Sequence, residues 1–225
     1  MDYLYTEPLP MPRATHYGNN YWIFRSRKLG RRVTAFSNLE YWNLLCLEMD
    51  PEVVHYCEQP CEQSVIIDGE RHKTVFDVYV VYRDGREEFQ EVKYSEELNS
   101  DTKQGERSRR QVEVQKYWCM QNNFGYSLRT DKEIEIGQYT VRNLSFLCAK
   151  ARRFSSCSVV DDGSVIRFLK ERGCVTIGQL YGSGRITEKN GLDYLADLCY
   201  RGVIKFVDIG STAIGNATEV MLYGM

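Results

Sequence analysis

Two apolar segments place charged side chains where a buried strand would not ordinarily hold them. The first, residues 74–82 (TVFDVYVVY), is interrupted by Asp77, and the second, residues 88–94 (EFQEVKY), carries Glu91 and Lys93. An unpaired carboxylate in an apolar interior is strongly unfavourable. The chain is therefore expected to give these acids a partner.

The link between the two segments predicts how they meet. Residues 83–86 read RDGR, and Asp-Gly between apolar runs is typical of a tight β-hairpin. Side chains two apart on a strand share a face, so Glu91 and Lys93 point the same way, and the hairpin can bring Asp77 beside them. Two carboxylates about 4 Å apart repel by about 4 kcal/mol at an effective dielectric of 20. Lys93 offsets part of this, and a bound Mg²⁺, which takes carboxylate oxygens, offsets the rest.

Such a centre suits the hydrolysis of a phosphodiester bond. Mg²⁺ polarises a phosphodiester oxygen and lowers the pKa of a bound water, and Lys93 can position that water. The D…ExK pattern predicts a nuclease centre on this basis. Acids and lysines are also common on surface strands, so a purely structural origin stays open for the pattern taken alone.

Glu40 and Gln90 have competing interpretations. Ser37-x-x-Glu40 is a capping box, which explains Glu40 at a helix start without any active site. Gln90 alternates to the strand face opposite Glu91, which makes it the less favoured ligand of the two.

Composition is that of an ordinary globular protein. The chain has 225 residues, 43% hydrophobic and 27% charged, with a net charge of −2 and no apolar run long enough to span a membrane. No secretion signal opens the chain, so its eight cysteines are expected to be reduced thiols of an intracellular protein. A zinc site built on His55, Cys57 and Cys61 lacks the usual ligand spacing.

Basic residues cluster near the N-terminus, in the stretch RSRKLGRR. A separated basic patch on a nearly neutral chain fits contacts to DNA phosphates, although a solvated surface would look the same. The candidate DNA-binding residues are Arg25, Arg27, Lys28, Arg31 and Arg32.

Periodicity and turn signals predict an α/β protein in two parts. We expect an N-terminal arm or loop over residues 1–36, a main domain over 37–155 and a small domain over 164–225, joined by the linker 155–163. The main domain should hold a mixed sheet flanked by helices, and the small one three helices and a hairpin, as in a winged helix. Expected helices cover residues 37–49, 106–122, 134–154, 164–172, 176–180 and 187–201, and expected strands cover 53–59, 63–67, 74–82, 88–94, 124–129, 203–209 and 217–224.

The chain contains, in this order, SNLEYWNLL, DPEVVHYCEQP, the segment with Asp77, EVK and LRTDKEI. In this motif order it resembles the TnsA family over about residues 25–155. These proteins are the endonuclease subunits of heteromeric cut-and-paste transposases. It implies a restriction-endonuclease-like fold of the PD-(D/E)xK type, with a winged-helix-like C-terminal segment.

The resemblance also implies a site. Glu40, Asp77, Glu91 and Lys93 become the catalytic residues, and Glu40, Asp77, Glu91 and Val92 the ligands of Mg²⁺, for which Mn²⁺ should substitute. Here Phe76 rather than proline precedes Asp77, and some relatives use Gln at the ligand position, which leaves Gln90 as an alternative; the spacing to Lys93 favours Glu91.

Finally, the resemblance implies a task and partners. Such a protein cuts double-stranded DNA at the 5′ ends of a transposon in the bacterial cytoplasm, beside a DDE-type transposase, TnsB, and an ATPase regulator, TnsC; no membrane is involved. Two other functions stay open. One is a stand-alone restriction-type or junction-resolving nuclease, and the other is an inactive DNA-binding adaptor.

Overall fold

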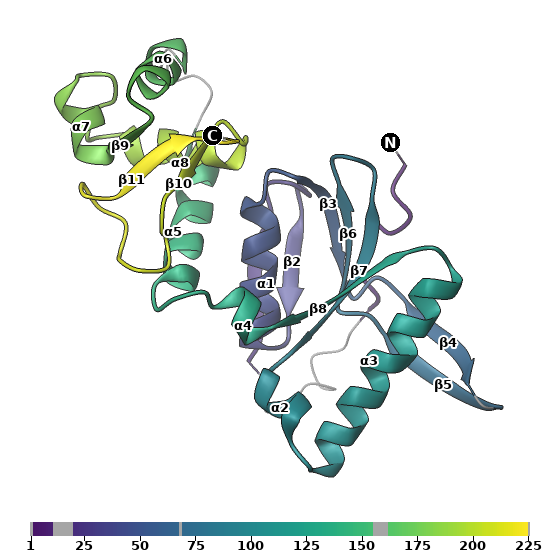
Figure 1. Ribbon diagram of the computed structural model, residues 1–225. Coiled ribbons are helices and arrows are strands. Elements are labelled where there is room, and N and C mark those ends of the chain that lie inside the picture. The colour runs from purple at the N-terminus through teal and green to yellow at the C-terminus, as the bar shows by residue number, and fades with distance from the viewer. Residues whose placement is uncertain (1, 11–19, 68, 155–161, 225) are drawn as a thin grey trace. The chain divides into compact units, whose positions relative to one another are not determined.

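The computed structural model describes residues 2–10, 20–67, 69–154 and 162–224 (Figure 1). Two compact units make up the chain. Unit 1 comprises Met1–Leu47 and Glu52–Ile134, and unit 2 comprises Glu48–Pro51 and Glu135–Met225. These limits differ from the expected domains, because residues 135–154 belong with the C-terminal unit.

A mixed four-stranded sheet forms the centre of unit 1. Its order is β3 (Val53–Glu58), β6 (Val78–Tyr82), β7 (Glu87–Lys93) and β8 (Gly125–Thr130). The first three strands are antiparallel and β8 runs parallel to β7. The predicted hairpin between β6 and β7 is confirmed, with Gly85 at φ 86° in its turn, a conformation that glycine adopts at little cost.

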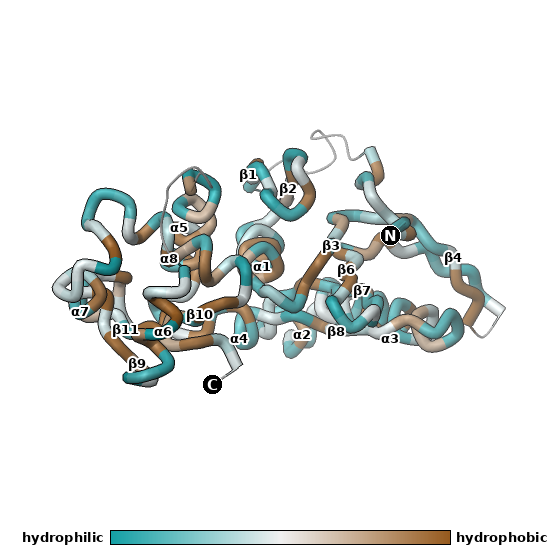
Figure 2. The backbone as a smooth tube through the Cα atoms, turned by 90° about the horizontal axis from the view of Figure 1, so that it is seen from above, coloured by the Kyte–Doolittle hydropathy of each residue, from teal (hydrophilic) through white to brown (hydrophobic). Residues whose placement is uncertain are grey.

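Helices cover both faces of this sheet. Helix α1 (Asn38–Met49) packs Leu44 and Leu47 against one face, in a cluster that includes Tyr56 of β3. Helix α3 (Lys103–Gln121) covers the other face, where Cys119 joins Phe89 of β7. The tube in Figure 2 is correspondingly hydrophobic along parts of α1 and β3. The unit is an α/β fold with a mixed sheet between helices, consistent with the expected restriction-endonuclease-like class.

The strand expected over residues 74–82 is in fact two strands. β5 (Glu70–Val75) pairs with β4 (Glu62–Ile67) in a separate two-stranded sheet, and β6 begins only at Val78. Phe76 and Asp77 form the break between them, with the Phe76 ring fully buried. The prediction was wrong because an apolar run does not show where a chain leaves one sheet for the next. Asp77 therefore stands directly before the first residue of β6.

The expected N-terminal loop also contains regular structure. Strands β1 (Trp22–Arg25) and β2 (Arg32–Ala35) form an antiparallel hairpin, with Gly30 at φ 67° between them. Val33 and Ala35 are buried in the core of unit 1. Each of these strands has only four residues, and they flank a basic turn. The sequence therefore shows too little alternation of polar and apolar side chains for the strands to be predicted. The remaining part of that expectation, residues 11–19, lies outside the described residues.

Two short helices complete unit 1, α2 (Ser95–Asn99) and α4 (Asp131–Ile134). Neither was predicted as a separate helix. Within the described parts of the chain, no helix is long and apolar enough to cross a membrane.

Unit 2 is mainly helical. Helix α5 (Thr140–Arg153) packs on α8 (Gly191–Tyr200), where Lys150 Nζ lies 2.8 Å from Asp193 Oδ1. The other elements are α6 (Asp162–Arg172), β9 (Cys174–Thr176), α7 (Ile177–Gly182), β10 (Ile204–Phe206) and β11 (Glu219–Leu222), and the strands form a sheet in the order β10-β11-β9. The three expected helices and the final hairpin are present, whereas the winged-helix assignment stays a prediction. Residues 155–161 of the expected linker lie outside the described part.

Candidate functional site

Asp77 and Glu91 meet at the end of the β6–β7 hairpin. The pairing of Val78 with Gln90 places Asp77 opposite Glu91, and the two carboxyl groups are within hydrogen-bonding reach. Asp77 Oδ2 accepts a hydrogen bond from the Val92 main-chain N–H at 2.8 Å. The hairpin thus fixes one acid by the backbone of the strand that carries the other.

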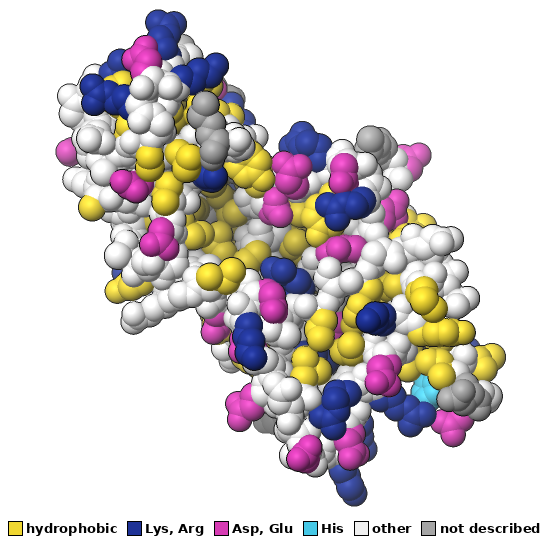
Figure 3. Space-filling view, in the orientation of Figure 1, with side chains coloured by type: hydrophobic (Ala, Val, Ile, Leu, Met, Phe, Trp, Pro, Cys, Tyr) yellow, Lys and Arg dark blue, Asp and Glu magenta, His cyan; other side chains and the backbone are white. Residues whose placement is uncertain are grey.

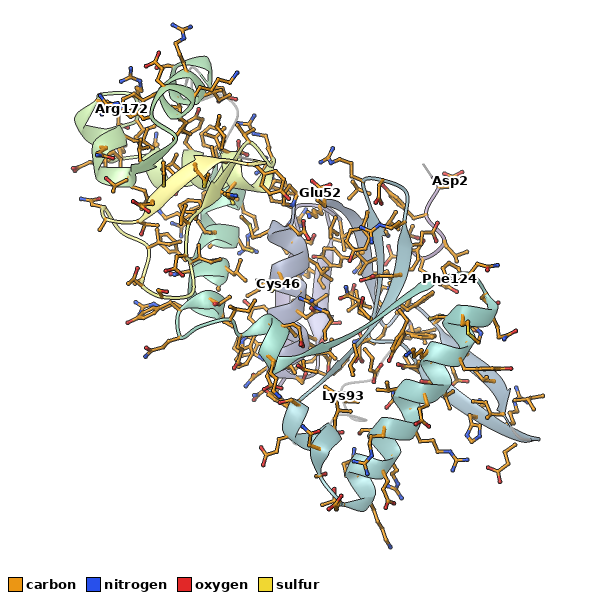
Figure 4. The ribbon with its side chains drawn as sticks, in the orientation of Figure 1. Asp2, Cys46, Glu52, Lys93, Phe124 and Arg172 are labelled. Atoms are coloured by element: carbon orange, nitrogen blue, oxygen red, sulfur yellow. The ribbon has the colours of Figure 1, made fainter. Side chains whose placement is uncertain are left out.

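Lys93 completes this group. Its Nζ lies 2.7 Å from Glu91 Oε1, and Glu91 is fully buried whereas the lysine side chain is 18% exposed. Lys93 ends β7 and is labelled in Figure 4. The predicted convergence of Asp77, Glu91 and Lys93 is therefore present.

The three groups shift one another's pKa values. Burial, and then the charge of Asp77, raise the pKa of Glu91 to about 8. Burial also raises the pKa of Asp77, against the opposing effect of Lys93. Burial alone would lower the pKa of Lys93, but Asp77 and Glu91 raise it above its ordinary value. Near neutral pH, Lys93 is a cation, and the raised pKa values of the two acids indicate that this site does not readily hold both carboxyl groups ionised without a further positive charge.

Gln115 is a site residue that the sequence analysis missed. It lies on α3, fully buried, and its Nε2 donates to Glu91 Oε2 at 2.7 Å and to Thr74 Oγ1 at 3.0 Å. Its Oε1 accepts from the Tyr126 hydroxyl at 3.1 Å. The fully bonded amide fixes the orientation of Glu91. The sequence feature that could have identified Gln115 is a glutamine on the helix face that packs against the sheet.

Glu40 serves as a cap and also lies beside the acids. The Ser37 hydroxyl accepts from the Glu40 N–H at 3.1 Å, as in a capping box, but Glu40 Oε2 accepts from the N–H of Phe36 at 3.1 Å. Gln59 Nε2 also donates to Glu40 Oε2, at 3.3 Å. Burial, and then the charge of Asp77, raise the pKa of Glu40 to about 7. Glu40 is thus both part of the helix cap and a neighbour of Asp77.

Gln90 faces away from this group. Its Oε1 accepts from Asn43 Nδ2 at 2.9 Å, and its Nε2 donates to Glu88 Oε1 at 2.7 Å. Both ends of the amide are occupied on the α1 side of the sheet. The geometry favours Glu91, as the spacing to Lys93 did.

The acids fit a hard divalent cation. Among the described residues, no three side chains of His, Cys, Asp or Glu converge as a complete ligand set. Mg²⁺ does not need one, because it is usually bound by one or two carboxylates and completes its shell with waters and substrate phosphates. Asp77 and Glu91 supply two carboxyl groups, and a divalent cation would favour the ionised form of both. Glu40 and the Val92 carbonyl stay predicted ligands.

The basic cluster divides into two kinds of residue. Arg31 forms a bidentate ion pair with the buried Glu58, both N–O distances being 2.8 Å, and Lys28 Nζ donates to the Leu47 carbonyl at 2.7 Å. Both therefore stabilise unit 1. The exposed members are Arg25, Arg27 and Arg32. Figure 3 shows basic and acidic side chains interspersed on the face in view.

Comparison with known families agrees with this geometry. The model of a family described as TnsA-like endonuclease N terminal matches residues 50–131. This segment is similar to a TnsA-like endonuclease domain. It contains Asp77, Glu91, Lys93 and Gln115, whereas Glu40 and nearly all of unit 2 lie outside the match. No curated protein matches the chain.

Proposed function

We propose that this chain is the Mg²⁺-dependent DNA endonuclease subunit of a transposase. It would hydrolyse phosphodiester bonds at the 5′ ends of a transposon, together with a DDE-type partner, TnsB. The observation that carries the proposal is the convergence of Asp77, Glu91 and Lys93 within a TnsA-like endonuclease domain. A fully buried Glu91 beside the partly buried Asp77 and a lysine is costly to keep unless the group is used.

Asp77 and Glu91 would hold the cation, with Glu40 and the Val92 carbonyl as further ligands. When bound, Mg²⁺ supplies Lewis-acid polarisation of the phosphodiester and a lowered pKa for an attacking water. The protein's own contribution is orientation. The Val92 N–H fixes Asp77, and Gln115 fixes Glu91.

Lys93 would act as a fixed positive charge. Its raised pKa keeps it protonated at neutral pH, so it is a hydrogen-bond donor and not a general base in this state. A partly exposed ammonium beside the acids can donate to a phosphate oxygen, where negative charge develops during hydrolysis. It can also orient the attacking water.

The proposed partner in direct contact with the chain is double-stranded DNA. Arg25, Arg27 and Arg32 are exposed and suited to its sugar-phosphate backbone. Such contacts position a protein on DNA but do not distinguish one base sequence from another. The transposase TnsB and the ATPase regulator TnsC enter the proposal as partners that the resemblance to the TnsA family implies.

One assay tests the whole proposal. End-labelled transposon-end duplex is incubated with Mg²⁺ and the chain, with and without co-purified transposase, and the nicks are mapped by strand. We expect nicks at the 5′ ends that require the transposase and are lost in Asp77→Ala. Cutting of arbitrary DNA without a partner would indicate a stand-alone nuclease. Intact DNA under all conditions would indicate an adaptor and overturn the proposal.

A further inference from the structure

Gln59 combines two unfavourable features at the end of β3. Its φ is +37°, in the left-handed region that residues with a Cβ rarely adopt. Its side chain is also polar and only 5% exposed. Glycine would satisfy the backbone at this position without strain, so the backbone gives no reason for a glutamine.

The position of Gln59 links two acids of the site. Its main-chain N–H donates to the Asp77 carbonyl at 2.8 Å, and its side-chain Nε2 donates to Glu40 Oε2 at 3.3 Å. Its own carbonyl accepts from the Leu9 N–H at 2.9 Å. Gln59 is therefore held at the end of β3 by two contacts. Its main chain bonds to the Asp77 turn, and its side-chain amide bonds to the first turn of α1.

The remaining atom of the amide, Gln59 Oε1, has no hydrogen-bond donor among the described residues. Four buried side-chain atoms in this part of the chain lack a hydrogen bond. Two are carboxylate oxygens that are 2.7 and 2.8 Å from lysine ammonium groups, namely Glu91 Oε1 and Asp193 Oδ1. Of the other two, Arg185 Nε is a donor, and Gln59 Oε1 is an acceptor. A buried acceptor without a hydrogen bond costs free energy of folding. In native proteins such an atom usually indicates an unseen water or ion.

The neighbouring groups indicate what would satisfy it. The Glu40 carboxylate next to the amide is an electron-rich oxygen group like Oε1, so it offers no hydrogen once ionised. Beside ionised acids, such an acceptor is satisfied by a cation or by a water, and a water that a cation holds meets both the amide and the acids. A neutral amide oxygen also adds a ligand without adding negative charge to a site that already contains two carboxyl groups and a single lysine.

We propose that Gln59 Oε1 is a further, uncharged oxygen ligand of the divalent cation, bound directly or through one of its waters. The inference rests on the proposed function, because it requires a cation at Asp77 and Glu91. It adds to the predicted ligands a residue that neither the sequence pattern nor the family match assigns.

Binding of Mn²⁺ to the full chain, measured by titration calorimetry and electron paramagnetic resonance, tests this without any cleavage assay. Gln59→Gly should weaken binding about tenfold or more, in the range that supporting residues of metal sites show. The melting temperature without metal should be unchanged or higher, since strain is relieved. Gln59→Glu keeps an oxygen and should bind at least as tightly as the wild type.

A matched control separates the backbone from the ligand. Asn123 also has a positive φ, +59°, at the turn before β8. Asn123→Gly relieves the same kind of strain and should leave the Mn²⁺ dissociation constant at the wild-type value. If Gln59→Gly fails to fold, Gln59→Asn, which tolerates the left-handed region, takes its place and should also weaken binding.

The outcomes are distinct. If the wild type binds Mn²⁺ at a site lost in Asp77→Asn, and Gln59→Gly binds equally well, the role of Gln59 is overturned while the proposed function stands. If the wild type binds no Mn²⁺, or Asp77→Asn binds it unchanged, the cation centre itself is overturned. Weakened binding in Gln59→Gly together with wild-type binding in Asn123→Gly supports the inference.

Discussion

Lys93 Nζ lies 2.7 Å from Glu91 Oε1, and Glu91 is fully buried. The single ammonium balances only one ionised acid, and Asp77 adds a second carboxyl group within hydrogen-bonding reach of Glu91. A buried ion pair with an extra acid is a poor device for stability. It is a suitable arrangement for holding a divalent cation beside a fixed ammonium.

Lys93→Met should abolish strand cleavage while the protein stays folded. Loss of a buried partner costs about 3–5 kcal/mol when the other charge cannot be neutralised. Here Glu91 can take up a proton, because its pKa is already raised to about 8, so the loss of stability should be smaller. Cleavage assays and urea unfolding at neutral pH check both parts.

Lys73→Met is the matched control for that variant. Lys73 Nζ lies 2.8 Å from Glu62 Oε1, but both side chains are about half exposed. Such a pair contributes about 0–1 kcal/mol. The control should cut normally and unfold at nearly the wild-type urea concentration. Normal cutting by Lys93→Met would contradict the role of Lys93.

Without divalent metal, the protein should lose stability as the pH rises from 5 to 8. The pKa of Glu91 is raised to about 8 and that of Glu40 to about 7, from an ordinary value of 4.5. In this window the folded state binds more protons than the unfolded state, so the free energy of unfolding falls with pH, by at most about 1.4 kcal/mol per pH unit for each group. Urea unfolding in EDTA measures the slope.

Two changes should alter this pH dependence. Glu91→Gln removes one titrating acid and should make the slope shallower. Mn²⁺ binds the ionised acids and releases their protons, so the metal should stabilise the protein more at pH 8 than at pH 5. A metal-free protein whose stability rises over the same range would contradict the raised pKa values.

Gln115→Leu should reduce cleavage about 10–100-fold, because Glu91 loses the amide that orients it. Gln104 provides the control on the same helix, since it is exposed. Gln104→Leu should cut at the wild-type rate. Equal rates for the two variants would show that the orientation of Glu91 by Gln115 is not needed.

The exposed arginines should account for part of the salt dependence of DNA binding. Changing Arg25, Arg27 and Arg32 to Gln should reduce the slope of log K against log salt by about 0.9 for each phosphate that an arginine neutralises in the wild type. Filter binding over a range of salt concentrations measures this. An unchanged slope would mean that the β1–β2 hairpin does not touch the DNA backbone.

Arg31 should behave differently from these residues. It pairs with Glu58, whose side chain is 1% exposed, so Arg31→Gln leaves a buried carboxylate unpaired. The expected loss is about 3–5 kcal/mol of unfolding free energy. A stability within the error of the wild type would show that this ion pair is not structural.

The local parts of the site were predictable from the sequence. Asp77, Glu91 and Lys93 lie on one hairpin, so the alternation of strand side chains and an Asp-Gly turn were sufficient to bring them together. The amides of Gln59 and Gln115 were not predictable in the same way. They reach the acids from β3 and α3, and contacts between distant segments leave no local period.

The fold shows the same division. The order of helices and strands along unit 1 follows largely from local sequence patterns. The separation of β5 from β6 into different sheets does not. The end of β5 at Val75 and the start of β6 at Val78 lie in one apolar run, and only tertiary packing around Phe76 decides where one sheet ends. The β1–β2 hairpin was missed because its buried residues, Val33 and Ala35, gain their apolar surroundings from α1 and β3.

Anomalous diffraction from a crystal soaked in Mn²⁺ above pH 8 tests the central claim most directly. We expect a peak within coordination distance of Asp77 and Glu91 carboxylate oxygens, and its loss in Asp77→Asn. A wild-type crystal with no peak between these two carboxyl groups would contradict the account.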